Sequence, residues 1–209
     1  MNFKIPKTMF SCISHKRKFS VPELYAILVL APRAVAILKR NESKKVLDEK
    51  FLERIMLAVT EVNGCVACSW AHTQIALEKG VSSEEISSLL GGKDEYIRPE
   101  EAKALLFAQH YADKKGRPLK KMYEAIVEEY GSEKAKIILS AAQVMMVGNV
   151  FGLSFSVLLA KKQGISEPGS SVVREVLFLV VGIILIPFAF LHAGLRKLVC
   201  LPNINYAKQ

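Results

Sequence analysis

The chain has 209 residues, of which 51% are hydrophobic and 23% charged, so it can bury one substantial core. This length fits one domain with appendages better than two domains. Residues 1–20 contain no continuous apolar stretch of the secretory type, and the four cysteines are scattered along the chain. These features argue against a secreted disulfide framework and predict a reducing, cytoplasmic location.

The net charge of +9 is unevenly distributed along the chain. Residues 1–50 carry an excess of seven positive charges and residues 161–209 an excess of four, whereas residues 51–160 carry an excess of two negative charges. Basic flanks suit either nucleic acid or an anionic membrane surface. Because the C-terminal flank is also hydrophobic, we expect membrane contact and no nucleic-acid partner.

Apolar residues that repeat with a helical period, over stretches longer than strands, predict an all-α protein. We expect a basic N-terminal arm at residues 1–20 and a helical domain at residues 21–165. Pro32 either interrupts the first helix of this domain or starts another. Capping residues and glycines delimit the later helices. These are expected at residues 45–62, at 65–79, from Ser82 or Ser83 to Gly91, from Pro99 to about Lys115, at 119–130 and at 133–160.

Residues 166–209 are expected to form a linker and a hydrophobic C-terminal helix. The 20 residues 176–195 carry no Asp, Glu, Lys or Arg, and as a helix they would be about 30 Å long, enough to cross a bilayer. The alternative is a helix packed on the core or on a partner subunit. We expect this helix to contact the membrane.

The motif Cys65-Val66-Ala67-Cys68 is followed by His72, and its spacing places all three reactive side chains on one face of a helix. Asn63-Gly64 forms a turn signal immediately before the motif. A helix that begins there would place its positive dipole end beneath both thiols and favour thiolate. The motif therefore predicts a dithiol redox site.

Other interpretations of the motif stay open. The two cysteines and His72 would supply three zinc ligands, and Cys12 and His15 offer a second pair. Zinc ligands more often sit on loops than on one continuous helix. Two inert, buried cysteines are also common, whereas a structural disulfide does not suit a reducing compartment.

Glu53 is a candidate partner for His72. If the helices on either side of Asn63-Gly64 are antiparallel, Glu53 lies level with residue 74, half a turn from His72. A carboxylate there would orient the imidazole and raise its basicity. On spacing alone, an ordinary surface glutamate is the simpler interpretation.

This arrangement of residues resembles the alkylhydroperoxidase D-like branch of the carboxymuconolactone decarboxylase superfamily. The resemblance covers roughly residues 45–160 and implies the helical bundle of that branch, here with an additional hydrophobic C-terminal helix. The residues that carry it are Glu53, Asn63-Gly64, Cys65-x-x-Cys68-x-x-x-His72, Gly80-Val81-Ser82 and the long later helix bearing Asn149.

The resemblance also implies roles for four residues. Cys68 would be the peroxidatic cysteine and Cys65 the resolving cysteine, while Glu53 and His72 relay the proton. The sequence departs from the best-studied pattern at Ala67, where a second histidine can stand between the cysteines. The true lactone decarboxylases lack the paired cysteines, so the resemblance does not extend to their reaction.

The sequence and the resemblance thus predict a thiol peroxidase that reduces hydroperoxides, organic ones by analogy with the family, without a bound cofactor or metal. Its expected partners are the hydroperoxide, an external dithiol reductant protein, a membrane and further copies of the chain, since relatives form trimers or hexamers. The alternative function is a redox-responsive or zinc-binding interaction protein without peroxidase turnover.

Overall fold

The computed structural model describes residues 5–12, 17–165 and 170–207. These residues form helices and no strands, which confirms the all-α prediction. The helices are α1 (Lys7–Cys12), α2 (Val21–Lys44), α3 (Glu49–Asn63), α4 (Val66–Glu78), α5 (Ser83–Leu90), α6 (Ala102–Asp113), α7 (Lys120–Lys162) and α8 (Val172–Leu198).

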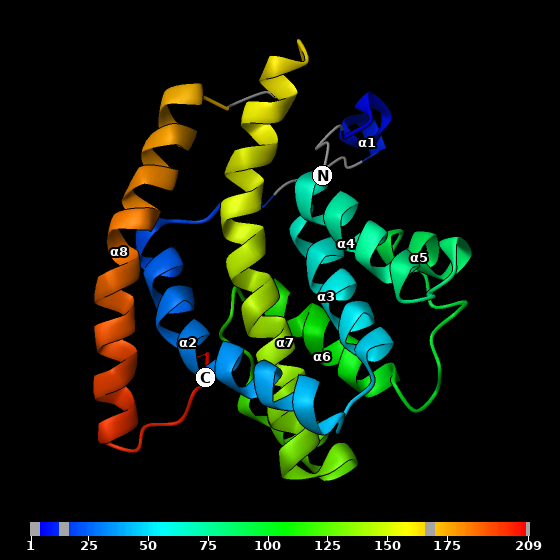
Figure 1. Cartoon of the computed structure of the whole chain (residues 1–209), viewed down its shortest axis with the longest axis vertical. Coiled ribbons are helices and arrows are strands. Elements are labelled where there is room, and N and C mark those ends of the chain that lie inside the picture. Colours follow the sequence, from blue (N-terminus) through cyan, green and yellow to red (C-terminus); the bar gives the residue numbers. More distant parts are fainter. Residues whose placement is uncertain (1–4, 13–16, 166–169, 208–209) are drawn as a thin grey trace.

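Helix α7 runs through the centre of the molecule and separates two groups of helices (Figure 1). Helices α2 and α8 pack on one side of it, and α3, α4 and α6 pack on the other. The helical path of α7 breaks at Gly131, whose φ of 75° and ψ of 161° are not helical. This break lies where the sequence placed the boundary between two helices.

Helices α3 and α4 are joined by a tight turn. Gly64 adopts a left-handed conformation (φ 66°) and donates its backbone N–H to the carbonyl oxygen of Thr60, which ends α3. Cys65 follows in an extended conformation and is the N-cap of α4. The turn therefore delivers the two cysteines directly to the start of a helix.

The N-terminal region differs in two details from what the sequence predicts, namely an interruption at Pro32 and an arm characterised only by its charge. Helix α2 continues through Pro32, and its start is fixed by a capping box in which Ser20 and Glu23 bond reciprocally. In the basic arm, Ile5 and Phe10 are buried against the core. These two apolar side chains dock the arm, although its charge is the more visible property of the sequence.

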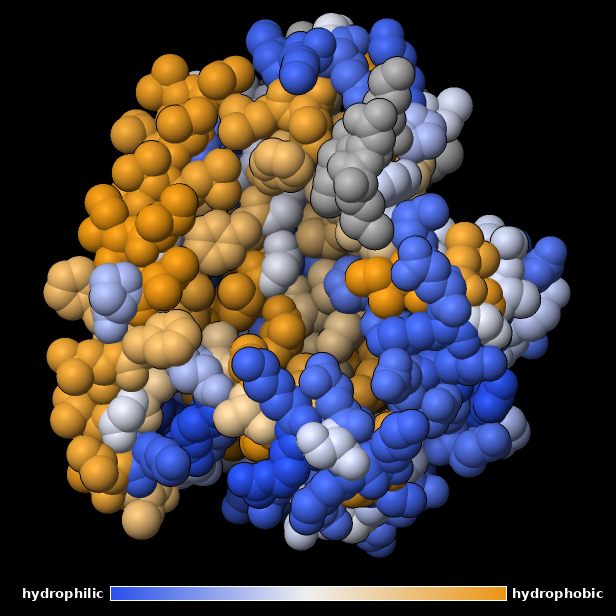
Figure 2. All heavy atoms as spheres, in the orientation of Figure 1, coloured by the Kyte–Doolittle hydropathy of each residue, from blue (hydrophilic) through white to orange (hydrophobic). Residues whose placement is uncertain are grey.

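Helix α8 packs along α2 and α7 through small side chains. Gly182, Ala189 and Ala193 are its buried residues. A Cβ at Gly182 would lie 2.5 Å from the ring of Phe151, so the glycine permits the close contact with α7. Most of the remaining α8 surface is apolar and exposed, and it forms a continuous hydrophobic area (Figure 2).

Three helices are long and apolar enough to cross a membrane by length and composition, namely α2, α7 and α8. In its most hydrophobic stretch α8 is the least covered by protein, whereas α7 is largely buried. The expectation of a long, apolar C-terminal helix is therefore confirmed.

Candidate dithiol site

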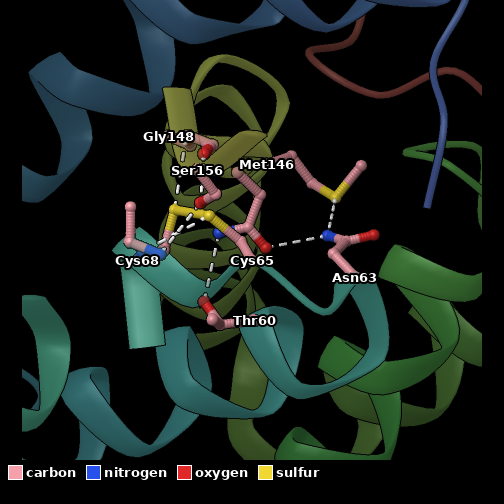
Figure 3. Close-up of a disulfide and its surroundings, with 10 residues drawn as sticks. Thr60, Asn63, Cys65, Cys68, Met146, Gly148 and Ser156 are labelled. Atoms are coloured by element: carbon pink, nitrogen blue, oxygen red, sulfur yellow. Dashed lines mark hydrogen bonds between the residues drawn. A yellow bond between two sulfur atoms is a disulfide. The ribbon is translucent and has the colours of Figure 1, made fainter. Parts of the chain in front are cut away.

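Cys65 and Cys68 form a disulfide at the N-terminus of α4 (Figure 3). Their Cα atoms are 5.3 Å apart, within the range that a disulfide requires. Cys65 is the N-cap residue and Cys68 lies in the first turn. Both sulfurs therefore lie at the positive end of the helix dipole, where thiolate is favoured once the bond is reduced.

The two cysteines differ in surroundings. The backbone N–H of Cys68 points to Sγ of Cys65 at 3.3 Å, so a thiolate at Cys65 would receive a hydrogen bond. Cys65 is fully buried, whereas Cys68 keeps 8% of its surface exposed. Cys68 is thus slightly less enclosed than Cys65, and Cys65 is the sulfur that this backbone N–H would stabilise.

Helix α7 closes the site on its other side through Gly148, Gly152 and Ser156. A Cβ at Gly152 would lie 2.7 Å from Sγ of Cys65 and closer still to Sγ of Cys68, so only glycine fits here. Sγ of Cys68 lies 3.5 Å from the carbonyl oxygen of Gly148, and Ser156 Oγ accepts the N–H of Ala67 at 3.0 Å (Figure 3). Sequence reasoning missed all three residues, although their four-residue spacing on an apolar helix signals one small-residue face.

A buried polar network ties the turn before the cysteines to α7. Asn63 donates to Asn149 Oδ1 at 2.9 Å and lies 3.2 Å from the sulfur of Met146. Asn149 in turn donates to Thr60 Oγ1 at 3.1 Å. Because buried polar groups are costly to leave unpaired, this network fixes the entry of the chain into α4.

Glu53 lies on α3 and reaches two side chains of α4. His72 Nδ1 lies 2.8 Å from Glu53 Oε2, and Lys79 Nζ donates to Glu53 Oε1, also at 2.8 Å. The Glu53 side chain is only 6% exposed, against 20% for His72 and 31% for Lys79. The structure therefore brings Glu53 and His72 together and adds Lys79, which sequence reasoning missed.

The charge on Glu53 is stabilised by these two neighbours. Burial alone would raise the pKa of Glu53, but the hydrogen bonds from His72 and Lys79 outweigh it and hold the pKa below its usual value. Burial likewise opposes the charge on Lys79, and the bond to Glu53 raises the pKa of Lys79 above its usual value. At neutral pH the site thus holds a carboxylate beside an ammonium group and an imidazole.

His72 lies on the same helix as Cys68. Cys68 and His72 are four residues apart on α4, so their side chains occupy adjacent turns of one face. Glu53 engages Nδ1 of the ring and leaves Nε2 for proton exchange. The arrangement provides a nucleophile, a base and a group that orients the base, which is the general pattern of nucleophilic catalysis.

The metal hypothesis has little support in the part of the chain that the structure describes. Within it, no group of three or more His, Cys, Asp or Glu residues is arranged to hold a metal ion. The second proposed ligand pair, the side chains of Cys12 and His15, lies outside the described residues.

The sequence model of the carboxymuconolactone decarboxylase family matches residues 30–110, which is under half of the chain. This segment contains Glu53, both cysteines, His72 and Lys79, whereas α7 and α8 lie beyond it. Comparisons with curated proteins and with solved structures found no match.

Proposed function

We propose that the chain is a dithiol peroxidase of the alkylhydroperoxidase D-like type, and the match of residues 30–110 to the carboxymuconolactone decarboxylase family supports this proposal. The observation that carries this proposal is the placement of the cysteine pair at a helix N-terminus, on the same face as an imidazole held by a buried carboxylate. Superfamily membership alone would also fit a decarboxylase, but a decarboxylase has no use for a dithiol.

In the first step, the thiolate of Cys68 attacks the terminal oxygen of a hydroperoxide. The O–O bond breaks, the sulfur is oxidised to a sulfenic acid, and the alcohol leaves with a proton supplied by His72. Glu53 remains ionised and holds the imidazole in place, while Lys79 keeps the second carboxylate oxygen occupied. The peroxide would meet Cys68 because it is the less buried of the two cysteines.

In the second step, the thiolate of Cys65 attacks the sulfenic sulfur. The S–O bond breaks, the disulfide forms, and hydroxide takes up a proton to leave as water. An external protein dithiol then reduces the disulfide by thiol–disulfide exchange and becomes oxidised itself. The hydrogen bond from the N–H of Cys68 suits Cys65 both as attacking thiolate and as leaving group.

The proposal includes the partners that this cycle requires. The substrate is a hydroperoxide, organic by analogy with the family, and the reductant is a separate dithiol protein of the cytoplasm. No bound cofactor takes part in any step. We also propose that the chain assembles into a trimer or hexamer, because members of the family that it resembles do so.

The test is peroxide consumption by the purified chain with a dithiol reductant. Cys68→Ser should abolish turnover, because the attacking sulfur is lost. Without the reductant, Cys65→Ser should consume about one peroxide per chain and keep its sulfenic acid, which a sulfenic-acid-trapping reagent detects, since no internal thiol resolves it. Cys200→Ser is the matched control, because Cys200 is an exposed free thiol outside the site, and it should behave like wild type.

Equal activity in all four proteins would refute the proposal. A disulfide that forms and is reduced reversibly, without peroxide consumption, would instead favour a redox-responsive interaction protein. Stoichiometric zinc released by a thiol-blocking reagent would favour the zinc-binding alternative.

A further inference from the structure

We propose that the outward face of α8 binds an anionic lipid bilayer with the helix axis in the plane of the membrane, so that α8 does not cross it. This inference is independent of the peroxidase proposal, because it uses no residue of the dithiol site. It names a partner for the exposed apolar face of α8 and the orientation in which that face binds.

Helix α8 has two faces of different character. Its covered positions recur every three or four residues and face α2 and α7. The opposite face carries large apolar side chains that are more than 40% exposed. They include Val176, Leu177, Val180, Ile183, Ile184, Phe188, Phe190, Leu191, Leu195 and Leu198.

Both ends of α8 are bound to the same helical domain. Near its start, Ser154 of α7 donates to Glu175 at 2.7 Å. After its end the chain turns back, and Asn203 donates to the carbonyl oxygen of Leu30 at 3.0 Å and to Gln143 at 3.1 Å. Arg33 of α2 also donates to the carbonyl oxygen of Leu201 at 2.8 Å.

These attachments are incompatible with a simple crossing of the bilayer. The hydrophilic surface over α3 to α6 lies on the other side of α7 from α8, at the same levels along the α8 axis (Figures 1 and 2). A crossing would either draw this charged surface into hydrocarbon or separate α8 and the following tail from the domain. Binding in the plane of the membrane breaks none of these contacts and buries the exposed apolar face.

The charge around α8 selects a membrane rather than a second copy of the chain. Basic residues lie at both ends of the helix and at the adjoining end of α7, namely Arg174, Arg196, Lys197, Lys161 and Lys162. Glu175 is the one acidic residue of segment 170–207, and it is bonded to Ser154 and Arg174. If the α8 faces of two copies of the chain met, their basic residues would repel one another. Anionic lipid headgroups would instead attract these residues.

The experiment is sedimentation of the full-length protein with lipid vesicles. Wild type should bind vesicles of phosphatidylcholine and phosphatidylglycerol at least about tenfold more tightly than vesicles of phosphatidylcholine alone. Changing Ile183→Glu together with Leu191→Glu should weaken binding at least about tenfold, because two exposed apolar side chains become charged. Leu106→Glu is the matched control, because Leu106 is equally exposed (60%) but lies on α6, and it should bind like wild type.

The orientation of α8 is tested by thiol labelling in membranes from producing cells. The native Cys200 follows α8, and Ser171→Cys marks its start in a chain that also carries Cys12→Ser, Cys65→Ser and Cys68→Ser. An impermeant maleimide should modify both ends from the same side. Modification of the two ends from opposite sides would overturn the in-plane orientation.

Two further outcomes would overturn the proposal. One is failure of the wild type to bind either kind of vesicle. The other is an oligomer that the double glutamate change dissociates while vesicles have no effect, because the face would then join copies of the chain. Circular dichroism of every variant checks that the helical fold is kept.

Discussion

The dithiol site and the outward face of α8 are built on opposite principles. At the dithiol site particular polar atoms contact one another, as in the contacts of Glu53 with His72 and Lys79. The outward face of α8 consists of aliphatic and aromatic side chains without such pairings. The first region depends on the identity of single atoms, and the second depends on apolar area.

This difference predicts how each region responds to substitution. A change of one atom at the dithiol site removes a contact that no neighbour can replace. A change on the outward face of α8 alters one part of a large area that solvent already reaches, so the fold is little affected. Substitutions in the dithiol site and on the outward face of α8 test this difference.

The largest effect is expected from Glu53→Gln, which keeps the shape of the side chain and removes its charge. Peroxidase activity should fall by about 100-fold, because the imidazole loses the carboxylate that orients it. Glu49→Gln is the control, since Glu49 lies one turn away, 3.6 Å from Lys79, but is half exposed. The measurement is kcat/KM with an organic hydroperoxide, and equal losses in the two variants would contradict the assignment.

A comparison of wild type with Glu53→Gln also gives a test of how the stability of the fold depends on pH. The pKa of Glu53 is held below its usual value of 4.5, so its charge stabilises the fold above that pH. The contribution is lost as pH falls through the lowered pKa. The difference in unfolding free energy between wild type and Glu53→Gln should therefore be constant from neutrality to about pH 5 and shrink under more acidic conditions. Urea unfolding across this range measures it.

A smaller effect is expected from a pair of helical glycines, one in each region. Gly152→Ala should destabilise the fold by about 1–3 kcal/mol, because the new methyl group collides with both sulfurs. Gly194→Ala on α8 meets no atom within 4 Å and should stabilise the fold by up to about 1 kcal/mol. Urea unfolding of the oxidised proteins would contradict the comparison if the two changes had the same sign.

The smallest effect is expected on the outward face of α8. Ile183→Gln should change the free energy of unfolding by no more than about 0.5 kcal/mol, since Ile183 is 62% exposed and has little packing to lose. Urea unfolding without lipid is the measurement. A loss of 2 kcal/mol or more would mean that this face is covered in solution and would erase the contrast between the regions.

The sequence predicts well those features that depend on local order along the chain. The cysteines and His72 share a helix, so their common face follows from helical spacing alone. The level of Glu53 follows from the turn at Asn63-Gly64, because a short turn fixes the register of two antiparallel helices. The break at Gly131 follows from the freedom of glycine to leave the helical region.

Features that depend on packing between distant segments are not predictable in this way. Gly152 is more than 80 residues from the cysteines, and its importance arises only from the approach of α7. Lys79 reaches Glu53 because a long side chain bends back from the end of α4. Helix α2 continues through Pro32 because packing on α7 and α8 offsets the lost backbone hydrogen bond, which local propensity does not report.

The close approach of Gly152 to the sulfurs has a mechanical consequence. The sulfurs occupy the space that a side chain of residue 152 would otherwise fill, so they are part of the packing of α7. Two separate thiols need more room than a disulfide, because sulfurs that are not bonded stand farther apart. If the cysteines cycle as we propose, α7 must accommodate each change between disulfide and thiols, because Gly152 packs directly against the sulfurs.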